Sequence, residues 1–185
     1  MSKLASLWLA LTLAISIPPL DPYLDGDMTR LMLIQVPTLI LLGVLLGPLM
    51  GVKFPMGQNF AFAGLILGLG LVMFWMIPRS LDLAVVDSRI DALMHLTLLA
   101  AGLMLRLSLP CLPLLIQMAA GIYATAMAAS LGVILNQTKE RICATFTLEQ
   151  QQAAGSAILW ACGLLLSIHL VWSLSRLVQT GTMDE

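Results

Sequence analysis

His95 is one of two histidines in the chain, and Asp91 precedes it by four residues. On a helix this spacing places both side chains on one face. The Asp91 carboxylate would then hold one imidazole nitrogen and leave the other free to bind a metal ion. A hydrogen bond from His95 to a neighbouring helix or to interfacial water is the competing interpretation, and it needs no metal.

A second group with ligand chemistry is formed by Asp27, Met28 and Met32. It offers one carboxylate and two thioethers within about one helical turn. Thioethers suit Cu(I), and a mixture of imidazole, thioether and carboxylate is compatible with copper but not with zinc. The competing interpretation is structural. The chain has 12 methionines, most of which must pack, and Asp27 would begin a helix, where the helix dipole favours an acid.

A third group, Gln150, Gln151 and Gln152, places several amides at the start of another apolar segment. Glutamine at a helix start satisfies free backbone donors, so this group needs no function. The segment from Thr147 to Gln150 has the Thr-x-x-Gln pattern of a capping box, which predicts that the last helix begins there. His169 lies deep in the same segment, too far from Gln150 at roughly 1.5 Å of rise per residue to join this group. We expect it to form a hydrogen bond to a neighbouring helix.

The elements that must position these groups are membrane helices. The 185 residues are 59% hydrophobic and only 10% charged, whereas a soluble domain has about a quarter of its residues charged. We expect an all-α, polytopic helical bundle that forms one domain over residues 1–185, with about six membrane spans. The expected spans are Leu4–Ile17, Leu31–Met50, Phe60–Ile77, Ala92–Leu109, Leu112–Leu135 and Ala153–Leu174. The first also has the length of a signal peptide, but it lacks the small-x-small cleavage pattern, so we expect a helix.

Spans that alternate in direction would bring all three polar groups to the same side of the bilayer. The lysines and arginines are too evenly divided to set the orientation by the positive-inside rule. The acidic residues gather on the side of the three groups, which we interpret as the outside. Small residues at Gly64-x-x-x-Gly68 and Ala120-x-x-x-Ala124-x-x-x-Ala128 would allow close contact between helices.

Several functions are disfavoured by what the sequence lacks. The formal net charge of -1 and the absence of a basic face argue against binding to nucleic acid. No nucleophile elbow, Walker loop or dinucleotide fingerprint is present, so we expect no enzyme. No Asp or Glu lies within a span, which argues against a proton-coupled transporter. Cys111, Cys143 and Cys162 are widely separated, and we interpret them as small buried hydrophobic residues.

The order of the three groups resembles that in a known family. The segment Asp27-Met28-Thr29-Arg30-Leu31-Met32-Leu33 resembles the His-Met-x-x-His-Met-Leu helix opening of the caa-type CtaG family of bacterial cytochrome oxidase assembly factors. Leu93-Met94-His95-Leu96 is similar to its Glu-His-Leu segment, and Gln150-Gln151-Gln152-Ala153-Ala154-Gly155 with Trp160 is similar to its Gln-Gln-x-x-Gly…Trp motif. Asp27 and Leu31 stand where the family has histidines, and Met94 stands where it has glutamate, so only His95 carries over as a ligand.

The resemblance implies a multi-pass protein of the bacterial plasma membrane that assists assembly or copper loading of a copper-containing respiratory oxidase at the outer face. On this hypothesis copper is the cofactor, with His95, Asp27, Met28 and Met32 as ligands and Asp91 orienting His95. The alternative is a non-catalytic accessory subunit of a multi-subunit membrane complex, with a degenerate metal site. A lipid or quinone site between helices is a third possibility. Membrane lipid is a partner in each case.

Overall fold

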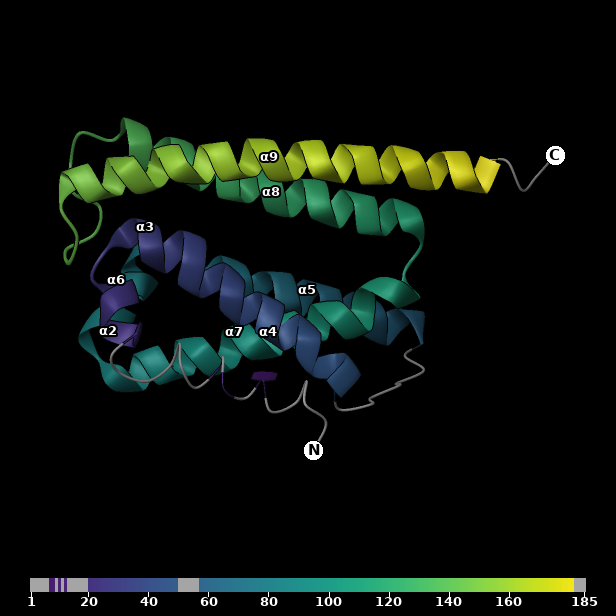
Figure 1. The fold of residues 1–185 in the computed structure, drawn as a ribbon, viewed down its shortest axis with the longest axis horizontal. Helices are drawn as coiled ribbons and strands as arrows, with labels where there is room; N and C mark the ends of the chain where they lie inside the picture. The colour runs from purple at the N-terminus through teal and green to yellow at the C-terminus, as the bar shows by residue number, and fades with distance from the viewer. Residues whose placement is uncertain (1–6, 9, 11, 13–19, 50–56, 182–185) are drawn as a thin grey trace.

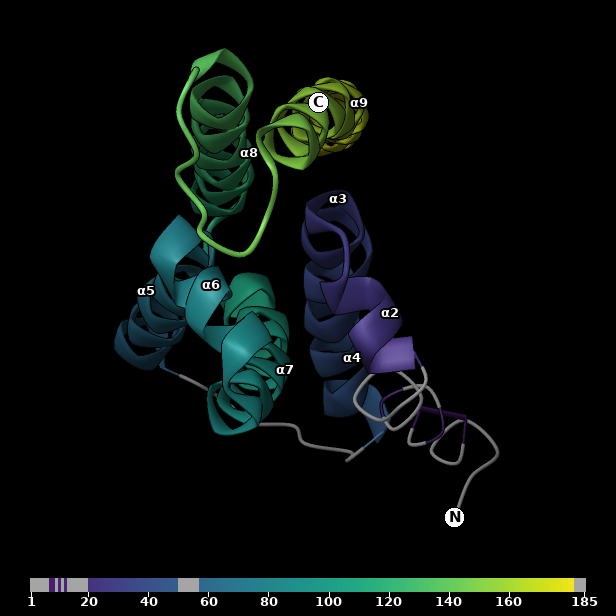
Figure 2. The same ribbon diagram turned by 90° about the vertical axis from the view of Figure 1, so that its left-hand side faces the viewer.

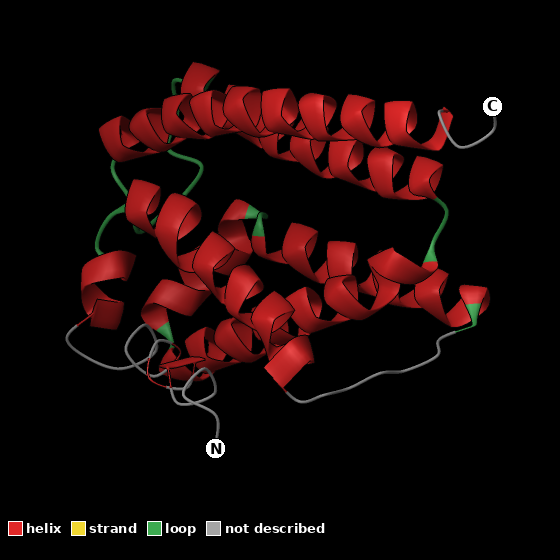
Figure 3. Cartoon of the chain, turned by 45° about the vertical axis from the view of Figure 1, so that its right-hand side comes forward, coloured by secondary structure: helices red, strands yellow, loops and turns green. Residues whose placement is uncertain are grey.

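The computed structural model describes residues 7, 8, 10, 12, 20–49 and 57–181, and in this part of the chain it contains helices and short loops but no strand (Figure 3). The all-α prediction is therefore confirmed. The helices, in chain order, are α2 (Leu20–Asp25), α3 (Met28–Arg30), η1 (Leu31–Gln35, π-helical), α4 (Val36–Leu49), α5 (Gln58–Trp75), α6 (Pro78–Val86), α7 (Ser88–Ser108), η2 (Leu109–Cys111, 3-10), α8 (Leu114–Gln137) and α9 (Leu148–Gly181).

Five helical segments within the described residues are long and apolar enough to cross a membrane. They are Met28–Pro48, Gln58–Trp75, Ser88–Cys111, Leu114–Gln137 and Leu148–Arg176. These correspond to five of the six expected spans. The remaining expected span, Leu4–Ile17, falls almost entirely outside the described residues. The protein is thus a multi-pass membrane protein, and its apolar helix surfaces contact lipid.

Helices α7 and α9 begin earlier than their apolar runs do, because capping groups set where these two helices start. Asp87 precedes α7, and its carboxylate accepts a hydrogen bond from the backbone amide of Arg89 at 2.8 Å. The helix therefore starts at Ser88, where the apolar pattern predicts Ala92. The capping box before α9 is confirmed in the same way: Thr147 Oγ1 accepts from the Gln150 amide at 3.2 Å, and Gln150 Oε1 accepts from the Thr147 amide at 3.1 Å.

The long helices lie side by side in two groups (Figures 1 and 2). Helix α7 packs between α4 and α5, while α8 and α9 form an antiparallel hairpin above them. Helix α3, which begins the span Met28–Pro48, contacts α9. The short amphipathic helix α6 packs on α7. Viewed along the helices, the five spans form a ring (Figure 2).

Glycines allow the helix backbones to approach closely at three places. A Cβ atom on Gly43 of α4 would lie 3.0 Å from Cα of Gly102 in α7, and a Cβ atom on Gly155 of α9 would lie 2.7 Å from the carbonyl oxygen of Gly132 in α8. The predicted Gly64/Gly68 pair also lies against α7, since a Cβ atom on Gly68 would lie 3.2 Å from the carbonyl oxygen of Ala101. Small residues therefore hold α4 and α5 on α7.

Candidate functional site

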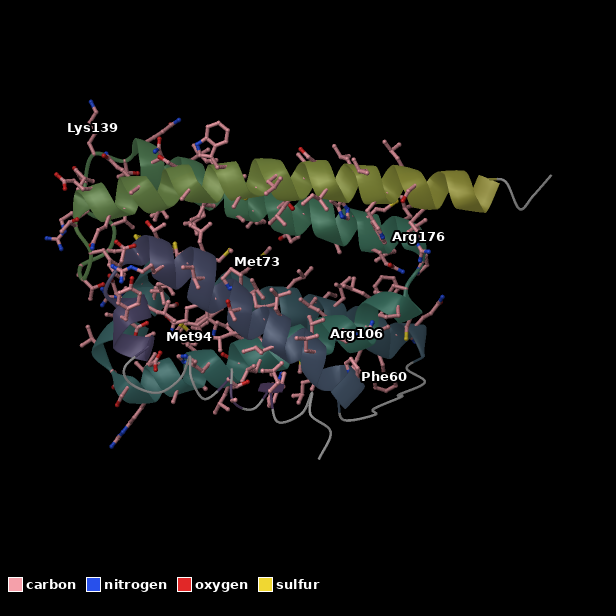
Figure 4. The ribbon with its side chains drawn as sticks, in the orientation of Figure 1. Phe60, Met73, Met94, Arg106, Lys139 and Arg176 are labelled. Carbon is pink, nitrogen blue, oxygen red and sulfur yellow. The ribbon has the colours of Figure 1, made fainter. Side chains whose placement is uncertain are left out.

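The three polar groups predicted to share one side of the membrane do lie at one end of the bundle. Helices α3, α7 and α9 all begin at the end that is on the left in Figure 1, where α6 and the α8–α9 loop also lie. Gln150 Nε2 donates to the carbonyl oxygen of Gly26 at 3.4 Å, which joins the start of α9 to the start of α3. We call this end the polar end. Lys139 marks it in Figure 4, whereas Arg106 and Arg176 lie toward the opposite end.

His95 is buried at the polar end, with 4% of its surface exposed. Its Nδ1 lies 2.9 Å from the Asp91 carbonyl oxygen and 3.2 Å from Asp91 Oδ1. Because both neighbours are acceptors, Nδ1 carries the proton and Nε2 is left as an acceptor. The expected contact between Asp91 and His95 on one helix face is present.

The second ring nitrogen of His95 has a neighbour that the sequence analysis missed. Gln35 Nε2 lies 3.3 Å from His95 Nε2 and donates to it. Gln35 is fully buried and ends the π-helical stretch η1, a type of helix that often occurs at functional sites. A polar residue inside the apolar run from Leu31 was the available signal, because intramembrane polar side chains need partners.

The Asp27 carboxylate has a structural role. Its Oδ1 accepts hydrogen bonds from the amides of Thr29 at 2.9 Å and Arg30 at 3.1 Å, which makes Asp27 the N-cap of α3. Arg30 does not pair with it, because its guanidinium donates to the Tyr23 carbonyl oxygen at 2.8 Å and lies over the Tyr23 ring. The interpretation of Asp27 as a helix start is confirmed.

The two methionines proposed as ligands lie in different surroundings. Met28 is fully buried in the main apolar cluster, which also contains Met94 and Leu98, and Figure 4 shows Met94 within the lower group of helices. Met32 lines an apolar cavity between η1–α4 and the α8–α9 hairpin. In this structure His95 Nε2 contacts the Gln35 amide, and Asp27 Oδ1 caps a helix. The metal role of His95, Asp27, Met28 and Met32 stays a prediction.

Gln151 organises the connection between α8 and α9. It is 1% exposed. Its Oε1 accepts from the Ile142 amide at 2.9 Å, and its Nε2 donates to the carbonyl oxygens of Glu140 at 3.3 Å and Leu135 at 3.5 Å. One side chain therefore satisfies backbone groups of the loop and of the last turn of α8, as expected of a buried amide.

Asp82 of α6 forms hydrogen bonds with the same loop. Its carboxylate accepts from the amide of Ala144 at 2.7 Å and from the amide and hydroxyl of Thr145, at 3.3 Å and 2.5 Å. Cys143 is fully buried in this loop. Cys162 is buried in α9, whereas Cys111 is half-buried. Burial, together with the nearby negative charge of Asp82, raises the pKa of the Cys143 thiol from 9.0 to about 11.

The raised pKa of Cys143 predicts a loss of stability in alkaline solution. In the unfolded chain the thiol ionises near pH 9, whereas in the folded chain it stays protonated to about pH 11. Between these values the unfolded state binds fewer protons, so the free energy of unfolding falls as the pH rises, by roughly 2–3 kcal/mol in total. Thermal unfolding in detergent at pH 8 and pH 10.5 measures this. Cys143→Ala is expected to flatten the dependence, and an equal slope in both proteins would contradict the prediction.

His169 forms the interhelical hydrogen bond expected of it. Its Nε2 lies 3.2 Å from the carbonyl oxygen of Met118 in α8, well away from the polar end. The ring packs against Gly121, where a Cβ atom would lie 2.5 Å from the imidazole Cε1. His169 thus helps to hold the hairpin together.

Fold and site together define a multi-pass helical membrane protein with a hydrogen-bonded polar network at one end of its bundle. Comparison of the chain with protein-family models, with curated proteins and with solved structures found no match.

Proposed function

We propose that the protein is a non-catalytic accessory or assembly factor of a multi-subunit membrane complex. The strongest support is that the polar side chains at the polar end form hydrogen bonds within the protein. Asp27 caps α3, Asp82 and Gln151 hold the α8–α9 loop, and His95 is engaged on both ring nitrogens. Such a network positions helices and a loop, and it supplies a shaped, rigid surface where a partner can dock.

The outer face of the α8–α9 hairpin provides surface for a partner within the membrane. Large apolar side chains of α9 are mostly exposed, among them Trp160 at 83% and Val171 at 69%. In the bilayer they contact lipid chains, and exchanging lipid for the helix of a partner has little cost because both are apolar. This surface suits a helical subunit of a larger complex.

The resemblance to CtaG suggests which complex this is. We propose a copper-containing respiratory oxidase of the bacterial plasma membrane, with the polar end facing outward. Affinity purification of the tagged protein in mild detergent is expected to recover oxidase subunits in fixed ratio, and deletion is expected to lower assembled oxidase. A normal level of active oxidase in the deletion strain, with no membrane partner recovered, would contradict the proposal.

Copper handling is a second candidate function, and the geometry of Asp91 and His95 favours it. The Asp91 carbonyl oxygen accepts from Nδ1, the Asp91 carboxylate lies 3.2 Å from it, and Nε2 is an acceptor. A backbone carbonyl or carboxylate on one ring nitrogen is common in metal-binding histidines. The obstacle is the Gln35 amide on Nε2, so binding would require that side chain to turn away.

Titration of the purified protein with Cu(I) tests this second function. About one ion per chain is expected to bind if His95 is a ligand, and His95→Ala is expected to abolish that binding. Gln35→Ala is expected to tighten it, because the ring nitrogen is freed. His169→Ala serves as the matched control, since it removes the other histidine. Sub-stoichiometric copper that His95→Ala leaves unchanged would remove the metal role.

A further inference from the structure

Two cavities lie between the α8–α9 hairpin and the remaining spans. The first, of about 330 Å³, is bounded by η1–α4, the end of α5, and the hairpin, and its lining includes Met32, Trp75 and Leu165. The second, of about 420 Å³, is bounded by α5, α7 and the hairpin, and its lining includes Gln117 and His169. Both lie among the membrane spans, so a ligand must reach them from the bilayer.

The two cavities follow one another along the same face of the hairpin. On α8, Ala124 lines the second cavity and Ala128 the first. On α9, His169 lines the second and Leu165 the first. Residues four apart share a helix face and are separated by roughly 6 Å of rise. In the alanine stripe, Ala120 and Ala128 pack against the two buried clusters, and Ala124 and Ala128 also line the cavities.

The polar groups of the second cavity are arranged to accept hydrogen bonds. His169 Nε2 faces the Met118 carbonyl oxygen, which can only accept, so Nε2 carries the proton and Nδ1 is an acceptor. No donor from the described residues reaches Nδ1, and the ring is only partly buried. Gln117 Nε2 donates to the Leu112 carbonyl oxygen at 2.9 Å, so its amide oxygen is also an acceptor.

These features specify the chemistry of an occupant. It must be soluble in the membrane and must carry a hydroxyl donor for His169 or Gln117. The aromatic side chain of Trp172, whose ring centroid lies 5.6 Å from that of His169, also lines this cavity and suits a planar ring. No Lys or Arg lines it, which disfavours a phosphate headgroup.

We propose that the second cavity binds the hydroxyl-bearing ring of an isoprenoid quinol, with its apolar tail in the first cavity. The tail is matched by the lining of the first cavity, which consists of apolar side chains throughout. His169 is the positioning acceptor for one ring hydroxyl. This site is separate from the polar end, and the proposal does not depend on the function proposed above.

Binding of decylubiquinol to the full chain in phosphatidylcholine nanodiscs, followed by quenching of tryptophan fluorescence, tests the proposal. Saturable binding is expected. His169→Phe keeps a planar ring but removes the acceptor, and it is expected to raise Kd about tenfold. Ala124→Phe places a ring inside the second cavity and is expected to abolish binding. Ala126→Phe, on the exposed face of α8, is the matched control and is expected to bind as wild type does.

Two further ligands identify the feature that is recognised. Decylubiquinone lacks the hydroxyl donor and is expected to bind about tenfold more weakly than decylubiquinol. Dodecanol has a hydroxyl and a tail without the ring, and it is expected to compete poorly. Equal quenching in wild type, His169→Phe and Ala124→Phe would overturn the proposal, as would dodecanol displacing decylubiquinol at equal concentration.

Discussion

Replacement of Gly102 by alanine is expected to destabilise the bundle by roughly 2–3 kcal/mol. The added methyl group would overlap the carbonyl oxygen of Ile40 in α4 and would lie 3.0 Å from Cα of Gly43. Both of these are backbone atoms in a helix, so they cannot rotate away as a side chain would. Helices α4 and α7 must move apart, and Leu39, Leu42 and Leu98, which lie in the same buried cluster, would lose contacts.

The control for this substitution is Gly70→Ala in α5, where a Cβ atom meets nothing within 4 Å. Alanine has the higher helix propensity by about 1 kcal/mol, so this variant is expected to be neutral or slightly more stable. Unfolding of both variants in a mixed-micelle titration with SDS gives the two free energies. Similar stabilities for Gly102→Ala and Gly70→Ala would show that α4 and α7 are not in backbone contact.

Replacement of Gln151 by leucine is expected to cost about 2–4 kcal/mol. Leucine has a similar size, but it leaves the Ile142 amide and the Glu140 and Leu135 carbonyl groups without the buried amide that bonds them. The α8–α9 loop is then expected to lose its structure first. The remaining hydrogen bonds that hold it, from Ala144 and Thr145 to Asp82, are exposed to solvent.

A readout specific to the loop is the reactivity of Cys143, which is fully buried in the folded chain. Gln151→Leu is expected to make it accessible to a membrane-impermeant maleimide, whereas Gln137→Leu, at an exposed position, is the control and is expected to leave it protected. If Gln151→Leu keeps both the stability and the protection of wild type, the buried amide is not what holds the loop.

Several features of this protein could be predicted from the sequence because local physics determines them. The apolar runs predict the spans, since a segment of that length and composition must be helical in lipid. Thr147 and Gln150 form their capping box within four residues, and Asp27 caps α3 through amides of its own first turn. The contact between Asp91 and His95 needs only one helix. In each case the partners are near neighbours in the chain.

The sequence by itself determined an all-α membrane protein, the capping box that begins its last helix, and the polar residues at one end of the spans. Only the tertiary structure decided which of those residues meet partners far away in the chain. Gln35 reaches His95 across 60 positions of the chain, and Asp82 reaches Thr145 across 63. Met32 lines the apolar cavity against the hairpin, a position that its place in the sequence does not reveal. The physical reason is that an apolar helix face fits many neighbours almost equally well, so the pairing of helices depends on close packing at glycines such as Gly102 and Gly155, which the hydrophobic pattern does not distinguish.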